Sequence, residues 1–378
     1  MIPPFTFATA GQIRFGRGTA EDGAAAAVLG FGPKVALVHG ATDTRARWLI
    51  DALHEAGAQV QTLACPGEPT LAALDAARAA LQADPPDVVV ALGGGAVIDL
   101  AKALAALVPS TRPALDHLEV VGRGLPLEAA PLPVVALPTT AGTGAEVTRN
   151  AVIGLPDQGV KVSLRDPRMY PDVAIVDSSL MQDAPKAVVL AAGLDAVTQV
   201  IEPYVCARAN PMTDALARAA IPQGLRALKA VVEGGTPDDW DAMAWTSLAG
   251  GLALANAGLG AVHGLAGVIG GVTGAAHGAI CGALLVPVIA ANRTAAAPDS
   301  ETHARLDWVA GEIAHVFGSL DGLARWAQSH GLQRLTTLGV APALRPEIAA
   351  KAQAASSMAA NPVPLPDAAL IEIMAAAG

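Results

Sequence analysis

The chain has 378 residues, which is long for one hydrophobic core and predicts two domains. Hydrophobic residues make up 52% of it and charged residues 15%, so it can bury a large core and is not of disordered composition. Its formal net charge of -10 argues against a nucleic-acid partner, which would need a basic face on the protein.

The cysteine pattern favours a reducing compartment. The chain has three cysteines, at Cys65, Cys206 and Cys281. They form no CxxC pair and no even set for disulfides, so we expect a cytoplasmic location. The first twenty residues lack the charged and apolar regions of a signal peptide. The apolar run 248–272 contains Asn256 and His263 and has no basic flanks, so it predicts a buried helical core without membrane association.

The first half of the chain alternates between strand and helix patterns. Apolar runs predict strands at residues 35–39, 59–63, 87–92 and 134–137, with helices at 46–57 and 71–83. This alternation predicts a parallel, doubly wound sheet that binds ligands at the carboxyl ends of its strands.

Strand patterns stop near Val176, and the rest of the chain is predicted to be helical. Helix breaks are expected at Pro211, Gly234-Gly235 and Gly270-Gly271. We therefore predict an α/β N-terminal domain over residues 1–180 and an all-α helical C-terminal domain over 181–378.

Two loops after predicted strands carry groups that can bind a phosphate or a ribose. Residues 93–95 are three glycines between a strand and a helix, where the backbone can approach a phosphate at the helix N-terminus. The alternative is a tight turn without a ligand, because GxGxxG is absent. Residues 138–146 offer three threonines and two glycines, or else a helix start capped at Thr143 or Gly144.

Polar residues in the apolar segment 191–205 need partners. Asp195 and Gln199 are four residues apart and share one helix face, with Glu202 nearby. An unpaired carboxylate costs several kcal/mol to bury, so Asp195 needs a cation, a hydrogen-bond network or a metal. The alternative is a helix N-terminal aspartate just after Gly193, stabilised by the helix dipole.

His263 and His277 are 14 residues apart in an almost wholly apolar stretch. On one continuous helix they would be about 21 Å apart, too far to share an ion bound at about 2 Å. Gly270-Gly271 and Gly274 offer a break that would let them converge. Two such histidines alone are more often core or capping residues, but with Asp195 they form a three-ligand set for a catalytic divalent ion.

Together these motifs resemble the iron-containing (group III) alcohol dehydrogenase family, whose fold is related to dehydroquinate synthase. The matching segments are IRFGRG at 13–18, GGGAVIDLAK at 93–102, PTTAGTGAEVT at 138–148, GLDAVTQVIEPY at 193–204, the histidine stretch at 263–282, and SSMAANPVPL at 356–365. The resemblance implies an NAD(P)-binding N-terminal domain, a helical metal-binding domain, and catalysis between them.

The resemblance also implies roles for single residues. By motif position, Gly94, Gly95 and Asp99 would lie at the cofactor phosphates and the adjoining helix. Thr139, Thr140 and Thr143 would line the adenine and ribose side, and Lys161 would lie at the nicotinamide ribose. Asp195, His263 and His277 match three of the family's four metal ligands and are the expected catalytic residues.

Three positions depart from the family pattern. Gln199 stands where the family has its second ligand, a histidine, and would be a weaker, neutral oxygen ligand for Fe²⁺ or Zn²⁺. Gly267 stands where many members have a histidine thought to relay protons. Gly40 stands where NAD-preferring members often have an aspartate, so NADPH should be tolerated, although Asp43 leaves NAD or NADP open.

The expected function is that of an NAD(P)-dependent alcohol dehydrogenase, or aldehyde or ketone reductase, with metal-assisted hydride transfer. The alternatives are a metal-independent reductase of the maleylacetate type, a polyol or sugar-phosphate enzyme of the same superfamily, and a cofactor-binding remnant without turnover. The expected partners are a small alcohol or aldehyde and, as the family implies, a second copy of the chain in a homodimer.

Overall fold

A computed structural model describes residue 2 and residues 4–378. The chain folds into two compact units. The sheet unit comprises Thr9–Thr140 and Gly144–Asp183. The helical unit comprises the residues up to Ala8, the short segment Ala141–Thr143, and Ala184–Gly378.

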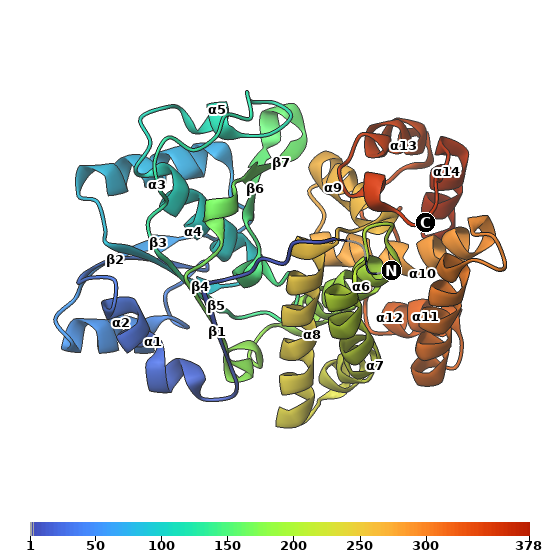
Figure 1. Cartoon of the computed structure of the whole chain (residues 1–378), viewed down its shortest axis with the longest axis horizontal. Helices are drawn as coiled ribbons and strands as arrows, with labels where there is room; N and C mark the ends of the chain where they lie inside the picture. Colours follow the sequence, from blue (N-terminus) through green and yellow to red (C-terminus); the bar gives the residue numbers. More distant parts are fainter. Residues whose placement is uncertain (1, 3) are drawn as a thin grey trace. The chain divides into compact units, whose positions relative to one another are not determined.

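The sheet unit is built on six parallel strands in the order β1-β8-β5-β4-β2-β3. Figure 1 labels β1 to β5 of this sheet. Their bounds are β1 Gln12–Phe15, β2 Lys34–His39, β3 Gln59–Ala64, β4 Val88–Gly93, β5 Val134–Pro138 and β8 Val173–Val176. The chain leaves β2 toward β3 and leaves β4 in the opposite direction toward β5, so the strand order reverses between β2 and β4. The predicted doubly wound parallel sheet is confirmed.

Helices cover both faces of this sheet because alternate strand residues point to opposite sides. The bounds are α1 Thr19–Leu29, α2 Arg47–Glu55, α3 Leu71–Ala83, α4 Gly95–Leu107 and α5 Ala114–His117. Val35 and Leu37 of β2 share a core with α1 and α2. Ala36 and Val38 share the other core with α3 and α4, on the opposite side of the sheet in Figure 1.

Part of the sheet unit was not predicted from the sequence. The sequence reading contained neither β1 nor α1, nor the antiparallel pair of β6 Asn150–Leu155 and β7 Val160–Arg165. Four short 3₁₀ turns complete the unit at Ala145–Val147, Pro156–Gln158, Pro167–Met169 and Ser178–Met181. The alternating polar and apolar residues of the pair are buried on one face only, which gives a weaker signal than the continuous valine runs of β4 and β5.

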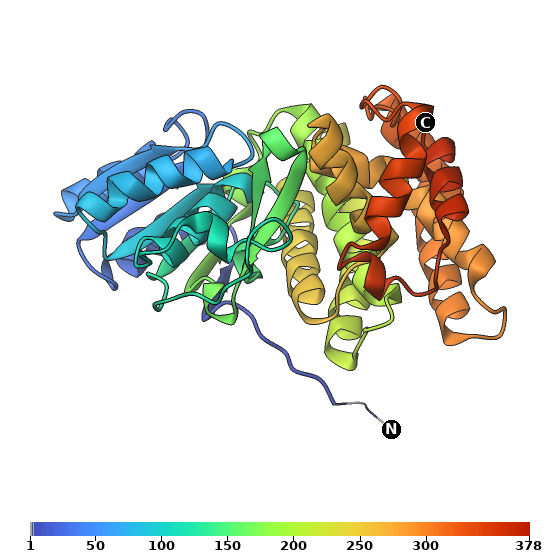
Figure 2. The same ribbon diagram turned by 90° about the horizontal axis from the view of Figure 1, so that it is seen from above.

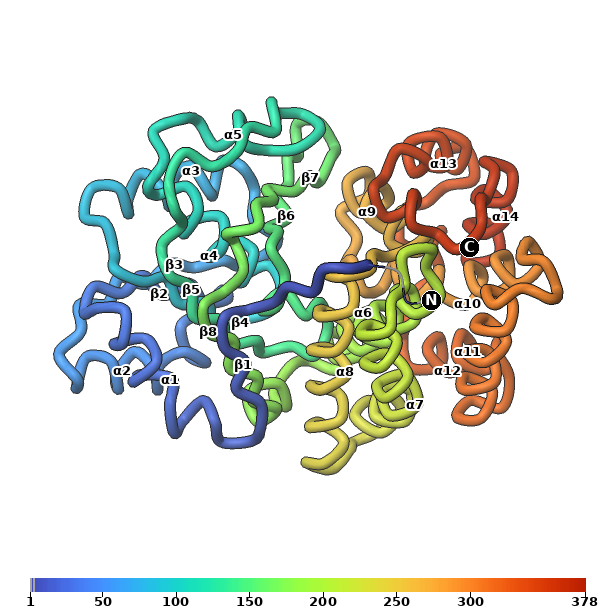
Figure 3. Tube along the Cα trace, in the orientation of Figure 1, coloured from blue at the N-terminus to red at the C-terminus, as the bar shows by residue number. Residues whose placement is uncertain are grey.

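The helical unit contains no strand among its described residues, which confirms the predicted all-α C-terminal region. Its helices are α6 Lys186–Val205, α7 Pro211–Glu233, α8 Pro237–Asn256, α9 Ala261–Thr273, α10 His277–Ala295, α11 Glu301–Phe317, α12 Leu320–Ser329, α13 Arg345–Gln353 and α14 Asp367–Ala376, with 3₁₀ turns at Pro342–Leu344 and Met358–Ala360. Helices α6, α7 and α8 run side by side in Figure 3, and α10 packs with α11, α12 and α14 in Figure 2.

Two of the three predicted helix breaks lie where expected, at the start of α7 and at Gly234, which has a φ of 110°. The break predicted at Gly270-Gly271 is wrong. Helix α9 continues through both glycines to Thr273 and ends at Gly274, whose φ is 68°. A glycine inside a helix costs only about 1 kcal/mol, whereas the left-handed turn at Gly274 strongly favours this residue type.

Several helices of this unit are strongly apolar. By length and composition alone α6 and α10 could cross a membrane, but 78% and 50% of their apolar windows are buried inside the chain. The apolar run at 248–272 is divided between α8 and α9, which are bent by 97°. These helices form the core of the helical unit.

Candidate metal centre and cofactor pocket

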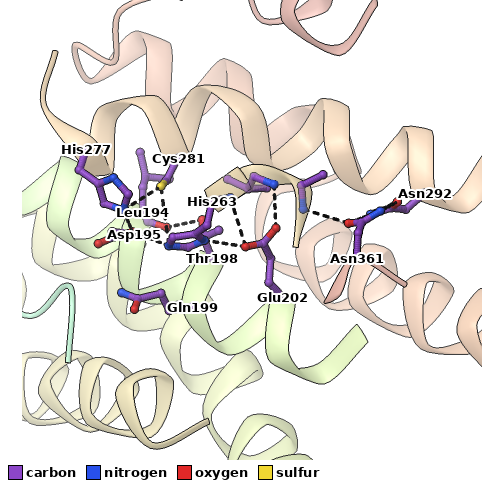
Figure 4. Close-up of polar contacts among 12 residues, drawn as sticks. Leu194, Asp195, Thr198, Gln199, Glu202, His263, His277, Cys281, Asn292 and Asn361 are labelled. Carbon is purple, nitrogen blue, oxygen red and sulfur yellow. Dashed lines mark hydrogen bonds and ion pairs between the residues drawn. The ribbon is translucent and has the colours of Figure 1, made fainter. Parts of the chain in front are cut away.

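Four side chains of the helical unit gather their ligand atoms in one cluster, shown in Figure 4. They are Asp195 of α6, His263 of α9, and His277 and Cys281 of α10, with ligand atoms within 4.8 Å of one another. Oδ1 of Asp195 lies 3.4 Å from Nε2 of His263 and 3.7 Å from Nε2 of His277. Sγ of Cys281 lies 3.9 Å and 3.6 Å from the same two nitrogens.

The carboxylate of Asp195 is the least satisfied group of the cluster. Its side chain is buried, and its Oδ1 accepts no well-oriented hydrogen bond within the described residues. Asp195 lies in the middle of α6, so the alternative of an aspartate at the helix N-terminus is wrong. A buried carboxylate oxygen without a partner costs free energy, which a cation at this point would recover.

A helix end brings the two histidines together. Helix α9 carries His263 in its first turn and ends at Gly274, and α10 begins at His277. The two imidazole centroids are therefore 5.3 Å apart, as the prediction of a break required.

Gly278 allows α10 to approach α6 closely beside this cluster. A Cβ atom at Gly278 would lie 2.2 Å from the carbonyl oxygen of Ala191 and 3.3 Å from Cβ of Asp195. Only a residue without a side chain fits there, so the glycine that follows His277 sets the distance from this histidine to Asp195.

Glu202, two turns after Asp195 on α6, holds His263 in place. Its Oε2 accepts a hydrogen bond from Nδ1 of His263 at 2.6 Å, and its Oε1 accepts one from the amide of Val262 at 2.8 Å. Asn361 accepts from the amide of Ala261 at 3.0 Å, so two buried side chains satisfy the N-terminus of α9 (Figure 4). Nδ1 of His263 is thereby directed to Glu202, and its Nε2 faces Asp195.

The protonation of the cluster reflects competing effects. Burial would raise the pKa of Asp195, but the charge of His277 and the contact with His263 outweigh it and lower that pKa. Burial would likewise lower the pKa values of both histidines, yet the neighbouring Cys281 and Asp195 raise that of His277 to about 9 and that of His263 well above its usual value. The cluster therefore attracts positive charge.

Two further residues belong to the cluster region. Cys281 is not among the ligands expected from the sequence, although its spacing of four residues from His277 places both on one helix face. Gln199 is buried on α6, and its amide nitrogen donates to the carbonyl of Gly142 at 2.9 Å. This is the only side-chain hydrogen bond of Gln199 within the described residues.

A pocket of about 440 Å³ opens in the sheet unit where the strand order reverses. It is lined after β2 by His39, Gly40, Thr42, Thr44 and Arg45, after β4 by Gly93 and Gly94, and after β5 by Thr139. Parallel sheets bind ligands at this kind of reversal. Gly94 is the N-cap of α4, so free backbone amides of that helix lie beside the pocket.

The pocket thus brings together three of the predicted cofactor residues, Gly40, Gly94 and Thr139. The other five lie outside its lining. Gly95 is the first residue of α4, and Thr140 packs against Gly94. Asp99 accepts a hydrogen bond from the amide of Val152 at 3.0 Å, and Lys161 forms an ion pair with Glu68. Thr143 belongs to the helical unit.

Comparison with known proteins assigns the family. The profile described as "Iron-containing alcohol dehydrogenase" matches residues 10–178, and that described as "Fe-containing alcohol dehydrogenase family, C-terminal" matches residues 189–378. The chain belongs to the iron-containing alcohol dehydrogenase family. This confirms the resemblance inferred from the sequence motifs.

Members of this family resemble the chain in sequence and in fold. Long-chain-alcohol dehydrogenase 1 of Geobacillus thermodenitrificans is 40% identical over 204 residues, which are 54% of this chain and 51% of that protein. NAD-dependent methanol dehydrogenase of Bacillus methanolicus is 38% identical over 206 residues, 54% of this chain and 53% of that protein. The match thus spans about half the length of these relatives. The crystal structure of 1,3-propanediol oxidoreductase superposes with a TM-score of 0.86 at 28% identity, covering 100% of both chains.

The residues present fit the divalent metal that the family name implies. An unpartnered carboxylate oxygen, two imidazole nitrogens and a thiol converge, and these are groups that bind Fe²⁺ or Zn²⁺. The carboxylate of Glu202 on the far side of His263 is the outer partner that a metal-binding histidine needs.

Proposed function

We propose that this family member is a reversible NAD(P)-dependent alcohol dehydrogenase that interconverts a small alcohol with an aldehyde or ketone. The observation that carries the proposal is the buried, unpartnered Oδ1 of Asp195, which lies within 3.7 Å of Nε2 of both His263 and His277. The nucleotide-sized pocket at the strand reversal supports the choice of a dinucleotide as the second reactant.

A bound nicotinamide dinucleotide would accept a hydride from the carbinol carbon of the substrate, and the hydroxyl proton would leave to solvent. Asp195, His263 and His277 would hold the divalent ion, with Gln199 or Cys281 as the fourth ligand. When bound, this ion polarises the substrate oxygen and stabilises its negative charge. Glu202 orients His263, and Gly267 provides no proton acceptor of its own on α9.

For the cofactor we propose that NADPH is accepted. Gly40 lines the pocket without a side chain, and no carboxylate belongs to the described lining that could repel a 2′-phosphate. Arg45 lines the same pocket. Asp43, the alternative partner of a ribose hydroxyl, pairs with Arg47 and is not part of the lining. The remaining predicted cofactor residues are proposed at the phosphates, at the adenine and ribose side, and at the nicotinamide ribose as their motifs imply.

We also propose a cytoplasmic homodimer as the working form. The three cysteines are free and buried, which suits a reducing compartment. Light scattering on a sizing column tests the dimer.

The function is tested on protein purified without chelators. Metal content is measured by elemental analysis, and NADH and NADPH oxidation is followed with aldehydes, ketones and maleylacetate. We expect about one divalent ion per chain, turnover with aldehydes or ketones, and loss of turnover on chelation.

Robust turnover by metal-free protein would contradict the metal-assisted reaction and favour the maleylacetate type. Absence of turnover with every substrate and both cofactors, in protein that binds metal and NADPH, would contradict the dehydrogenase assignment.

A further inference from the structure

Two residues are candidates for the fourth ligand of the metal ion, Gln199 and Cys281. We propose that Cys281 provides the fourth ligand, so that an Asp-His-His-Cys set replaces the ligands expected from the family, and that this set favours Zn²⁺ over Fe²⁺. The inference rests on the proposed metal-assisted function and deepens it by naming a ligand and the metal.

Four of the six distances between ligand atoms are close to the edges of a tetrahedral zinc site. Bonds of about 2.0–2.1 Å to nitrogen and oxygen and about 2.3 Å to sulfur give tetrahedral edges of about 3.4 Å for O···N and about 3.6 Å for S···N. From Asp195 the observed O···N distances are 3.4 and 3.7 Å. From Cys281 the S···N distances are 3.6 and 3.9 Å. The edges of an octahedral site with similar bonds would be shorter, about 3.0 Å.

The side chain of Gln199 is held by a contact outside the cluster. Its amide nitrogen donates to Gly142, in the short segment Ala141–Thr143 that belongs to the helical unit. Helix α8 packs against its backbone side, since a Cβ atom at Gly250 would lie 3.1 Å from Cβ of Gln199. In Figure 4 no interaction joins Gln199 to the cluster, whereas Cys281 is joined to both histidines. The residue that replaced the family's histidine thus has a contact of its own with Gly142.

The choice of metal follows from the ligand chemistry. Thiolate is a soft ligand that selects Zn²⁺, and Zn²⁺ also exceeds Fe²⁺ in the general order of affinity for nitrogen and sulfur sites. In a mixture of both ions we therefore expect Zn²⁺ to displace Fe²⁺.

The test is cobalt substitution, because a thiolate bound to Co²⁺ gives a charge-transfer band in the near ultraviolet that carboxylate, imidazole and amide ligands do not give. The whole chain is stripped with a chelator, loaded with Co²⁺ and recorded as wild type, C281S, Q199A and the buried-cysteine control C206S. Zn²⁺ affinity is measured in parallel by competition with a chromophoric chelator.

We expect the band in wild type, Q199A and C206S and its loss in C281S. Zn²⁺ binding should weaken by more than about 100-fold in C281S and stay within about threefold in Q199A. Circular dichroism and thermal unfolding establish that each variant is folded. If C281S does not fold, C281A replaces it in the experiment.

A cobalt protein without the band, or a band that persists in C281S, would overturn the inference. So would a loss of affinity in Q199A but not in C281S, which would make Gln199 the ligand. These spectra do not depend on turnover, so the two proposals can fail separately. A protein that shows the charge-transfer band but has no activity would contradict only the proposed function. An active enzyme without the band would contradict only the thiolate ligand.

Discussion

At the scale of single residues, Glu202 combines two roles that are usually separate. Its carboxylate accepts from two consecutive backbone amides at the start of α9, at 2.8 and 3.4 Å, and from the ring of His263 at 2.6 Å. The same negative charge therefore stabilises the helix end and increases the basicity of the histidine nitrogen that faces the metal.

Changing Glu202 to glutamine keeps the shape of this contact and removes its charge. We expect Zn²⁺ affinity to fall by about 10–100-fold, because the amide polarises His263 less, and the midpoint of thermal unfolding to fall with the weaker cap. Chelator competition and calorimetry measure the two effects. Glu347→Gln is the control, because Glu347 is exposed and pairs with the exposed Lys351. Wild-type metal affinity in Glu202→Gln would show that the contact is only structural.

Gly40 is the residue at which cofactor choice can be tested. A Cβ atom there meets nothing within 4 Å, so Gly40→Asp introduces a carboxylate into the pocket without a steric clash. The ratio of kcat/KM for NADPH to that for NADH should fall by about tenfold or more, since the new charge repels the 2′-phosphate. Asp43→Asn should leave the ratio unchanged. An unchanged ratio in Gly40→Asp would place the ribose away from β2.

At the scale of secondary-structure elements, the metal cluster depends on how closely α6 and α10 cross. A Cβ atom at Gly278 would overlap the carbonyl of Ala191, and one at Gly282 would lie 2.5 Å from Leu194. Two glycines one turn apart thus line the same contact and let the backbones approach.

Gly278→Ala should force these helices apart. We expect the free energy of unfolding to fall by about 1–3 kcal/mol from overpacking, and Zn²⁺ affinity to drop, because His277 moves away from Asp195. The control is Gly311→Ala in α11, where nothing lies within 4 Å, and which should be neutral or stabilising by up to about 1 kcal/mol. Denaturant unfolding measures the free energy of unfolding, and chelator competition measures the Zn²⁺ affinity. Equal values of both quantities in the two variants would contradict the close crossing of α6 and α10.

Some features of the helices could be predicted from the sequence and others could not, for physical reasons. A helix end between His263 and His277 could be predicted, because one ion cannot bridge about 21 Å. Its position could not, since glycine is tolerated inside a helix and only the folded chain shows that Gly274 takes the left-handed turn. The place of Cys281 depends on α10 crossing α6, and no local pattern contains that contact.

At the scale of the whole molecule, the two reactants are assigned to different parts of the chain. Each described member of the metal cluster belongs to the helical unit, and the described lining of the nucleotide pocket belongs to the sheet unit. The strand and helix alternation and the helical second half could be predicted from hydrophobic patterns, because these patterns report which face is buried. The pairing of β1 with β8 could not, because it joins strands far apart in sequence.

This division predicts how the protein responds to loss of its metal. Chelation should lower the unfolding midpoint, because an ion present at about 100 times its dissociation constant stabilises the fold by about 2.7 kcal/mol. NADPH should still bind within about twofold of its original affinity, since no described pocket residue is a member of the metal cluster. Calorimetry and NADPH fluorescence titration on one preparation, before chelation, after it and after addition of Zn²⁺, measure both quantities. A tenfold loss of NADPH affinity that Zn²⁺ restores would show that the two sites are energetically coupled, contrary to this assignment.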